Sequence, residues 1–345
     1  MSHQSYGEIH FSYREMQQTY NEVLRQKERI EAFFKDRREV VLLGCGSSFW
    51  GALSAYRSFN LYTDKRATAI KAADIAMSPR EFEHLFEDPV IIAPSRSGKS
   101  RELLDAVEIM RGYYPNLKVL SITQYPENEL QKMSDLNLSI PWAKEISICQ
   151  TRSFSCLYLA SITIAGILGS PGLLDDIQSY LNAAPGYYAE AEAKVKGLVD
   201  TMESPEIVAL GNGIQYGTTV EGAYIILEMA EHLVNYFQTL EYRHGPIVAA
   251  GPNTYAFIAA TSAENILRED QMALEIKSHG GKVILCGRAA EDGRFDECFT
   301  LDSKYPEEIR GLFFVTMMQS VAYHLALKKG IDPDSPGELK QFISY

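Results

Sequence analysis

The stretch "VIIAPSRSGKSRELLDAVEI" (residues 90–109) combines an apolar run, a serine-rich loop and a helical pattern. The apolar run Val90–Ala93 is typical of a buried strand, and the recurrence of Leu103, Leu104 and Val107 indicates the buried face of a helix. A strand that leads through a short loop into a helix is the building unit of α/β proteins with parallel sheets.

The last residues of this loop, Gly98-Lys99-Ser100, match the end of the nucleotide-binding loop G-x-x-x-x-G-K-[ST]. That loop needs another glycine five residues earlier, and this chain has Ala93 there. ATP binding is therefore not expected. The loop can still hold another phosphate, because hydroxyls and backbone N–H groups at a helix N-terminus bind anions.

The same pattern occurs twice in the chain. "FIAATSAENILREDQMALEI" (257–276) repeats the opening stretch, and "VALGNG" (208–213) repeats "VLLGCG" (41–46) at the same offset. Apolar strand runs alternate with helical patterns at 40–43, 90–93, 119–123, 207–210, 255–260 and 283–286. We therefore predict an α/β protein of two tandem three-layer αβα domains, each with a flavodoxin-like, doubly wound parallel sheet.

The predicted organisation starts with a helical segment at 1–35. A first domain follows at 36–185, and a second domain at 186–345 ends in a C-terminal tail. The boundary is placed within 171–205, where the helical pattern at 187–202 indicates a connecting helix.

Composition excludes several classes of protein. A hydrophobic content of 46% and a net charge of -12 describe a globular protein without the basic patch of a nucleic-acid binder. No apolar run approaches the ~18 to 20 residues of a membrane span, and the N-terminus is polar. The five cysteines form no C-x-x-C pair, which suits a reducing compartment. We expect a cytoplasmic protein without membrane or nucleic-acid partners, and without a metal or other cofactor.

Two glycine–serine loops follow strands of the first domain. "GCGSS" (44–48) and "SRSGKS" (95–100) each lead into a helix, and parallel strands direct such loops to one crevice. A serine cluster can also cap a helix without binding any ligand, so neither loop alone indicates a phosphate site. The prediction of a phosphate site depends on the presence of both loops. The dinucleotide-binding motif G-x-G-x-x-G is absent, because Phe49 stands where the third glycine would be. In the second copy, Ile214 and Gln215 replace the serines, so only the first copy is expected to bind phosphate.

These loops, the repeat and "EGAYIILEMAEHLVNYFQTLEYRHGP" (221–246) together resemble the sugar isomerase (SIS) domain family. The likeness is to double-SIS chains similar to the isomerase half of glucosamine-6-phosphate synthase and to the ketosamine-6-phosphate deglycases. It covers roughly residues 30–345, and its His-Gly-Pro is specific; no preceding glutaminase domain is expected. The resemblance implies two tandem SIS domains and a small-molecule sugar phosphate as substrate.

The resemblance also implies site residues. Glu228 and His244 fall on the catalytic carboxylate and histidine, and the family's histidine comes from a neighbouring subunit, which implies a homodimer with shared active sites. Arg96 lies where the synthase carries a glutamine. The expected substrate-binding residues are Gly46, Ser47, Ser48, Ser95, Arg96, Ser97, Ser100, Gln150 and Lys340.

The chemistry agrees with these roles. A carboxylate in an apolar helix has a raised pKa and suits proton transfer at carbon, while an imidazole suits ring opening. Glu228 could instead be an exposed helix glutamate, since Glu221 and Glu231 lie nearby. The family's lysine three residues before the glutamate is Ile225 here, and Lys340 lies one place from the tail lysine.

These departures favour release of an amine by Glu228 and His244 alone. We therefore predict an enzyme that releases an amine from a 6-phosphorylated ketosamine or amino sugar through an enediol or enaminol, as a deglycase does. The alternatives are a glucosamine-6-phosphate-type deaminase, an aldose–ketose isomerase, and a non-catalytic sugar-phosphate sensor, which would need the serines but not the Glu–His pair.

Overall fold

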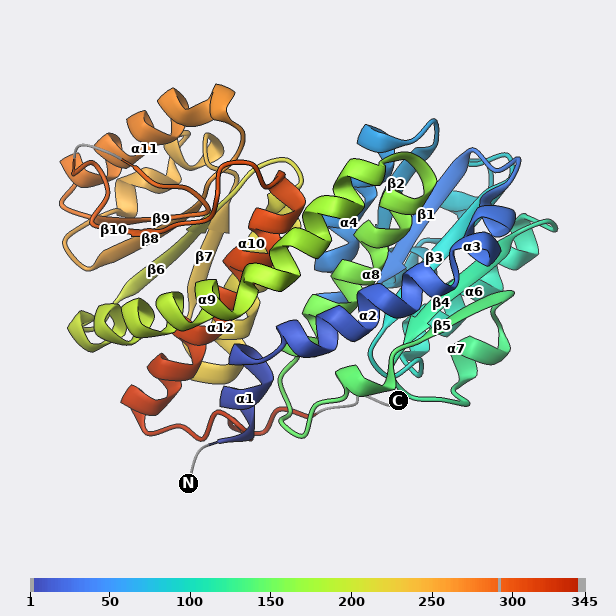
Figure 1. Ribbon diagram of the computed structural model, residues 1–345, viewed down its shortest axis with the longest axis horizontal. Coiled ribbons are helices and arrows are strands. Elements are labelled where there is room, and N and C mark those ends of the chain that lie inside the picture. Colours follow the sequence, from blue (N-terminus) through green and yellow to red (C-terminus); the bar gives the residue numbers. More distant parts are fainter. Residues whose placement is uncertain (1–2, 291–292, 341–345) are drawn as a thin grey trace. The chain divides into compact units, whose positions relative to one another are not determined.

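The computed structural model describes residues 3–290 and 293–340 and divides into two compact units (Figure 1). The N-terminal unit comprises residues 12–145 and 152–178, together with Lys340. The C-terminal unit comprises residues 3–11, 146–151 and the described part of 179–339.

The N-terminal unit contains a five-stranded parallel sheet of order β2-β1-β3-β4-β5. This is the flavodoxin-like order, in which the chain reverses direction across the sheet between β1 and β3. The strands are β1 (Glu39–Gly44), β2 (Arg66–Lys71), β3 (Pro89–Ser95), β4 (Lys118–Thr123) and β5 (Leu136–Ser139).

Helices cover both faces of this sheet. One face packs on α4 and α8, and the other buries a core formed with α5 and α6 that includes Val41, Ile91 and Val107. The helices are α2 (Tyr13–Arg25), α3 (Lys27–Phe34), α4 (Ser47–Tyr62), α5 (Ala72–Met77), α6 (Arg101–Tyr113), α7 (Glu129–Lys132) and α8 (Arg152–Gly169). Two short 3₁₀ helices are η1 (Pro79–Phe82) and η2 (Pro141–Ala143).

The C-terminal unit repeats this topology. Its parallel sheet has the order β10-β9-β8-β6-β7, which is the same order when the strands are numbered from β6. The strands are β6 (Glu206–Leu210), β7 (Val234–Phe237), β8 (Thr254–Ala259), β9 (Lys282–Cys286) and β10 (Glu297–Phe299). The expectation of an α/β fold with parallel sheets is thus confirmed, whereas the division into two tandem SIS domains stays a prediction.

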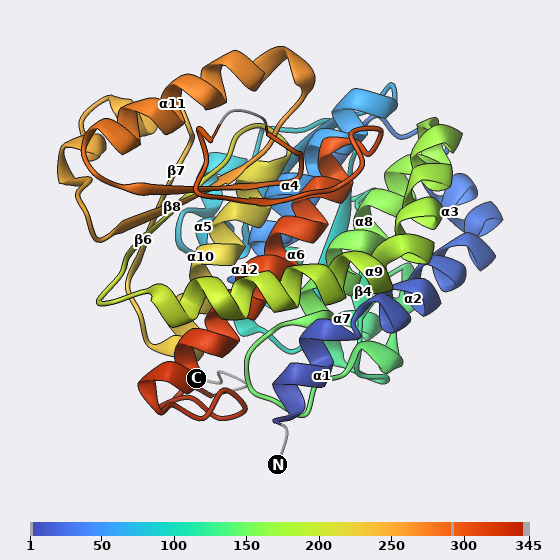
Figure 2. The same cartoon turned by 60° about the vertical axis from the view of Figure 1, so that its left-hand side comes forward.

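Within the C-terminal unit, α10 and α12 run side by side, as both views show (Figure 2). The helices are α1 (Gln4–His10), α10 (Gln215–Ala230), α11 (Ile266–Ser278) and α12 (Glu307–Lys329), with η3 (Glu241–Arg243), η4 (Pro246–Ala249) and η5 (Ala263–Asn265). The helix α9 (Pro171–Thr201) supplies its first eight residues, to Gln178, to the N-terminal unit and the rest to the C-terminal unit. It is longer than the helix expected at 187–202, and the division of the chain at 185/186 stays a prediction.

The six strands expected from the sequence are all present, but four others were missed. β1, β3, β4, β6, β8 and β9 are the three inner strands of each sheet, whereas β2, β5, β7 and β10 lie at the edges. The inner strand β3 is buried throughout, whereas β2 is buried only at Ile70. Edge strands expose one side and therefore lack a continuous apolar run.

The helix α8 differs from the expectation that no apolar segment of the chain approaches the length of a membrane span. By length and composition α8 could cross a membrane, with a mean hydropathy of 1.3. However, 83% of it is buried inside the fold, as expected of a core helix.

A polar cluster fixes α1 to the rest of the C-terminal unit. The carboxylate of Glu192 on α9 accepts hydrogen bonds from His10 Nε2 (2.5 Å), His324 Nε2 (2.8 Å) and Ser320 Oγ (2.7 Å). Burial alone would raise the pKa of Glu192, but the hydrogen bonds from the two histidines hold it well below its usual value.

Candidate active site

The first serine loop joins β1 to α4. Gly46 makes the turn with φ +50°, and Ser47 begins the helix. A Cβ on Gly44 would lie 2.7 Å from the backbone nitrogen of Phe49, whereas a Cβ on Gly46 would meet nothing within 4 Å. The first glycine is therefore needed for close strand–helix packing, and the second leaves open space beside the loop.

The backbone of this loop differs in one respect from the sequence-based expectation. The N–H of Ser48 donates to the carbonyl of Cys45 (3.1 Å), so it is not available to a ligand. Ser47 and Ser48 are largely buried, with 5% and 7% of their surface exposed. Burial, helped by the nearby carboxylate of Glu102, raises the pKa of the Cys45 thiol to about 12. Cys45 is therefore an uncharged neighbour rather than a nucleophile.

The second serine loop joins β3 to α6. Ser95 Oγ accepts the N–H of Gly98 (3.1 Å), and Ser97 Oγ accepts the N–H of Lys99 (3.1 Å). A hydroxyl that accepts a hydrogen bond keeps its own proton to donate, so both serines remain donors for an anion. Ser100 precedes α6 and makes no capping hydrogen bond through its side chain.

This second loop is braced by the segment after β4. Gly98 has φ +64°, and its carbonyl accepts the N–H of Leu130 (3.1 Å). A Cβ on Gly98 would lie 2.1 Å from Asn128 Oδ1. The side chain of Asn128 is itself fixed by Thr123 Oγ1 (3.0 Å) and by the N–H of Gln131 (2.9 Å). Only glycine therefore fits at position 98.

Arg96 is held by a buried carboxylate. Its NH1 lies 3.4 Å from Glu145 Oε2, and the other oxygen of Glu145 accepts the N–H of Ser153 (2.9 Å). The Glu145 side chain is fully buried, so its charge needs both partners. A contact between Arg96 and a substrate stays a prediction.

The two serine loops leave the same edge of the sheet. They follow β1 and β3, which are neighbours paired in parallel from Val40–Val90 to Leu42–Ile92. Each loop ends at the N-terminus of a long helix, where the helix dipole favours negative charge. Hydroxyl donors at two such helix ends form an arrangement that can bind a phosphate dianion.

Sequence reasoning overlooked one residue of this edge. Gln124 follows β4 directly, its N–H donates to the carbonyl of Arg96 (3.3 Å), and only 2% of it is exposed. Neither atom of its side-chain amide has a hydrogen-bond partner in the part of the chain that the structure describes. Its position after the third inner strand was the signal that could have identified it.

The predicted catalytic residues belong to the C-terminal unit. Glu228 lies in the last turn of α10 and is half-buried, and Ile225 beside it is buried. The expected role of Glu228 as the catalytic carboxylate stays a prediction. His244 lies between η3 and η4 and is exposed, with its N–H bonded to the carbonyl of Glu241 (3.0 Å). The structure assigns neither residue a role by itself.

The last two predicted residues lie in different units. Gln150 belongs to the C-terminal unit, and its Oε1 is buried without a hydrogen-bond partner among the described residues. Lys340 belongs to the N-terminal unit and is exposed.

One group of side chains has the spacing of a metal site. The ligand atoms of His3, Asp332 and Asp334 lie within 4.8 Å of one another. However, Asp334 accepts hydrogen bonds from the N–H groups of Gln4 and Ser5 (2.8 Å each), so it caps the start of α1. This cluster therefore has a structural explanation.

A sequence model of the SIS domain matches residues 33–165, which contain both serine loops. Both serine loops therefore lie in a segment that is similar to the SIS domain family. The match covers one such domain, so a second SIS domain in the rest of the chain stays a proposal.

Curated relatives extend the likeness over nearly the whole chain. Glutamine–fructose-6-phosphate aminotransferase (isomerizing) from Thermotoga maritima is 23% identical in an alignment of 337 positions that covers 92% of this chain and 53% of that protein. The enzyme of the same name from Brucella abortus is 24% identical over 334 residues, covering 92% and 54%. The chain thus spans about half the length of these relatives.

Solved structures show the same fold. Glucosamine-6-phosphate deaminase from T. maritima has a TM-score of 0.77 and 25% identity, and the match covers 94% of this chain and 99% of that chain. Tagatose-6-phosphate ketose/aldose isomerase from Escherichia coli has a TM-score of 0.87 at 19% identity, covering 97% and 95%. The relatives and neighbours point to an enzyme.

Proposed function

We propose that the chain is a phosphosugar enzyme whose serine loops hold the 6-phosphate of an amino sugar or ketosamine. The observation that carries this proposal is the pair of serine loops at the ends of the adjacent strands β1 and β3, each at the N-terminus of a helix. Ser95 and Ser97 retain hydroxyl protons that can be donated to phosphate oxygens.

The proposed reaction releases an amine from the sugar phosphate. Glu228 removes a proton from carbon to give an enaminol and returns the proton to the neighbouring carbon, which leaves an imine. Water then hydrolyses the imine to a sugar carbonyl and the free amine, while His244 assists ring opening or protonates the leaving amine. Ile225 is buried where a lysine of the synthases would stand, so a Schiff base at that position is not available. The lack of a lysine at position 225 favours release of the amine without a covalent enzyme–substrate intermediate at this residue.

A second candidate is a deaminase or an aldose–ketose isomerase. The specific observation in its favour is the likeness to a glucosamine-6-phosphate deaminase, which covers 94% of this chain and 99% of that chain. All three reactions share proton transfer next to a sugar carbonyl, so the same carboxylate and histidine serve each of them. A sensor without catalysis is less well supported, since it would not need Glu228 and His244.

We further propose a cytoplasmic homodimer in which a second copy supplies His244. This histidine is exposed, and the large apolar side chains of Leu233 (84% exposed) and Val248 (82% exposed) lie close to it in the sequence. Exposed apolar side chains in such a segment favour a protein interface. The proposed reaction needs no cofactor, nucleic acid or membrane.

The test is a panel of 6-phosphorylated fructosamines, glucosamine 6-phosphate and fructose 6-phosphate, with products followed by mass spectrometry. Release of an amine from a fructosamine 6-phosphate supports the deglycase, while turnover of glucosamine 6-phosphate or fructose 6-phosphate supports the second candidate. If no sugar phosphate is turned over and none raises the melting temperature, the proposed function is wrong.

A further inference from the structure

The C-terminal unit has a pocket of its own at the carboxyl edge of its sheet. The pocket holds about 340 Å³ and is lined by Asn212, Thr239, Leu240, Thr261, Asn265, Arg268 and Glu269. Asn212 follows β6 and Thr261 follows β8, and the chain reverses direction across the sheet between these two neighbouring strands. Such switch points are where doubly wound sheets bind ligands.

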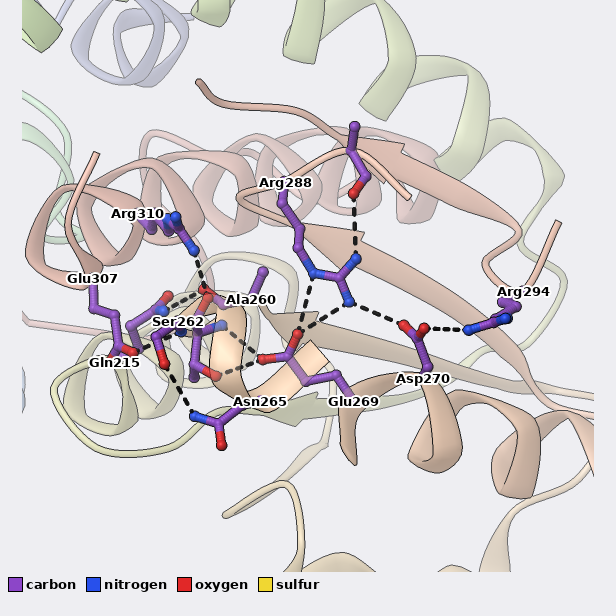
Figure 3. Close-up of polar contacts among 12 residues, drawn as sticks. Gln215, Ala260, Ser262, Asn265, Glu269, Asp270, Arg288, Arg294, Glu307 and Arg310 are labelled. Carbon is purple, nitrogen blue, oxygen red and sulfur yellow. Dashed lines mark hydrogen bonds and ion pairs between the residues drawn. The ribbon is translucent and has the colours of Figure 1, made fainter. Parts of the chain in front are cut away.

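The backbone donors that would bind a phosphate here are occupied by the protein itself. Glu307 Oε1 accepts the N–H of Ser262 (2.8 Å), and Glu269 Oε1 accepts the N–H and the hydroxyl of Thr261 (2.7 and 2.6 Å; Figure 3). In the equivalent loop of the N-terminal unit, Ser95 and Ser97 only accept backbone hydrogen bonds, so their hydroxyl protons remain to be donated. This pocket is therefore unsuited to a phosphate group.

The charges around the pocket are compensated, with one exception. Glu269 Oε2 accepts two hydrogen bonds from Arg288 (3.3 and 3.2 Å), which also pairs with Asp270 (3.0 Å; Figure 3). Arg310 donates to backbone carbonyls, including that of Tyr305 (2.9 Å). Glu269 thus accepts four hydrogen bonds, which uses the capacity of a carboxylate.

The exception is Arg268. Its NH1 donates to Asn265 Oδ1 (2.8 Å), and within residues 3–290 and 293–340 it forms no ion pair. Two further polar groups of the lining are available: the side chain of Asn212 forms no hydrogen bond there, and the hydroxyl of Thr239 is buried without a partner. A buried polar group without a partner indicates a missing water or ligand.

We propose that this pocket is a second ligand site, which binds a small polyhydroxy carboxylate such as a sugar acid without a phosphate. The guanidinium of Arg268 holds the carboxylate, because its planar donors match that group. Thr239 and Asn212 bind hydroxyls. An amino acid fits less well, since the saturated carboxylate of Glu269 cannot accept from an ammonium group. The volume suits a molecule about the size of a hexose derivative.

This inference does not depend on the proposed function, and its test uses different ligands. D-Gluconate is titrated into the full chain by calorimetry, with sorbitol as the matched ligand that lacks a carboxylate and L-serine as the amino-acid probe. We expect gluconate to bind in the millimolar range or tighter and sorbitol and L-serine to bind at least about tenfold more weakly.

Variants locate the binding. Arg268 is exposed, so Arg268→Gln is expected to fold and to weaken gluconate binding at least about tenfold, the change expected when one charge-assisted contact is lost. The matched control Arg111→Gln removes an exposed arginine from the other unit and should leave binding unchanged, as should Ser97→Ala in the serine loop. No gluconate binding, equal binding of sorbitol or L-serine, or unchanged binding by Arg268→Gln would each overturn the proposal.

Discussion

Alanine at Gly98 tests whether the second serine loop is fixed by the segment after β4. The left-handed backbone at this position costs an alanine about 1 to 2 kcal/mol. The added Cβ would also lie 2.1 Å from Asn128 Oδ1 and displace that side chain. Asn128 makes hydrogen bonds with Thr123, Tyr125 and Gln131, and losing them costs roughly 1 kcal/mol each.

The total of about 4 to 5 kcal/mol corresponds to a fall in melting temperature of roughly 8 to 20 °C for a domain of this size. Gly330→Ala is the matched control, because Gly330 has φ +73° and ψ +22° in the left-handed region and its Cβ would meet nothing within 4 Å. The control should lose only roughly 2 to 8 °C. Scanning calorimetry of both variants measures the difference. If Gly98→Ala is as stable as Gly330→Ala, the loop is not held as described.

Three further predictions follow from the two units. Ser97→Ala should weaken the binding of a hexose 6-phosphate by about 1 to 3 kcal/mol, measured by calorimetry, and an unchanged affinity would remove Ser97 from the phosphate site. Glu192→Gln should lower the melting temperature at neutral pH, because the depressed pKa of Glu192 gives stability that is present above the ordinary value of 4.5. That stability is lost as the pH falls below 4.5, so the difference between wild type and variant should shrink there, and a constant difference would contradict the assignment. Mixing inactive Glu228→Gln and His244→Ala chains should restore part of the activity if two copies share a site, whereas inactive heterodimers would argue against sharing.

The sequence predicted the inner strands of both sheets because those strands are buried on two faces. "VVLLG" in β1 and "VIIAP" in β3 are apolar at nearly every position, which is typical of strands covered by helices on both faces. The edge strand β2, "RATAIK", has a charged residue at each end and a threonine between two alanines, so it has no such apolar run. Its place in the sheet depends on pairing with β1, which is a tertiary contact.

The serine loops could be predicted because each is a short continuous stretch of sequence. The residues that hold these loops in place could not be predicted, because they come from distant parts of the chain. Arg96 pairs with Glu145, 49 positions away, and Gly98 is matched to Asn128 in the segment after the next strand. Nothing in the spacing of these residues indicates contact. Likewise, the half-burial of Glu228 depends on what covers the last turn of α10, which the apolar neighbours in its helix do not determine.

Exchange of the substrate's C1 or C2 hydrogen with solvent measures most directly whether Glu228 transfers the proton at carbon. The sugar phosphate that proves active is incubated in deuterated water with wild type and with Glu228→Gln, and deuterium at C1 or C2 is followed by mass spectrometry. The account predicts exchange by wild type, and exchange and turnover about 100- to 10,000-fold slower in the variant, with phosphate binding retained. Exchange by Glu228→Gln at the wild-type rate would contradict the account and assign the proton transfer to another residue.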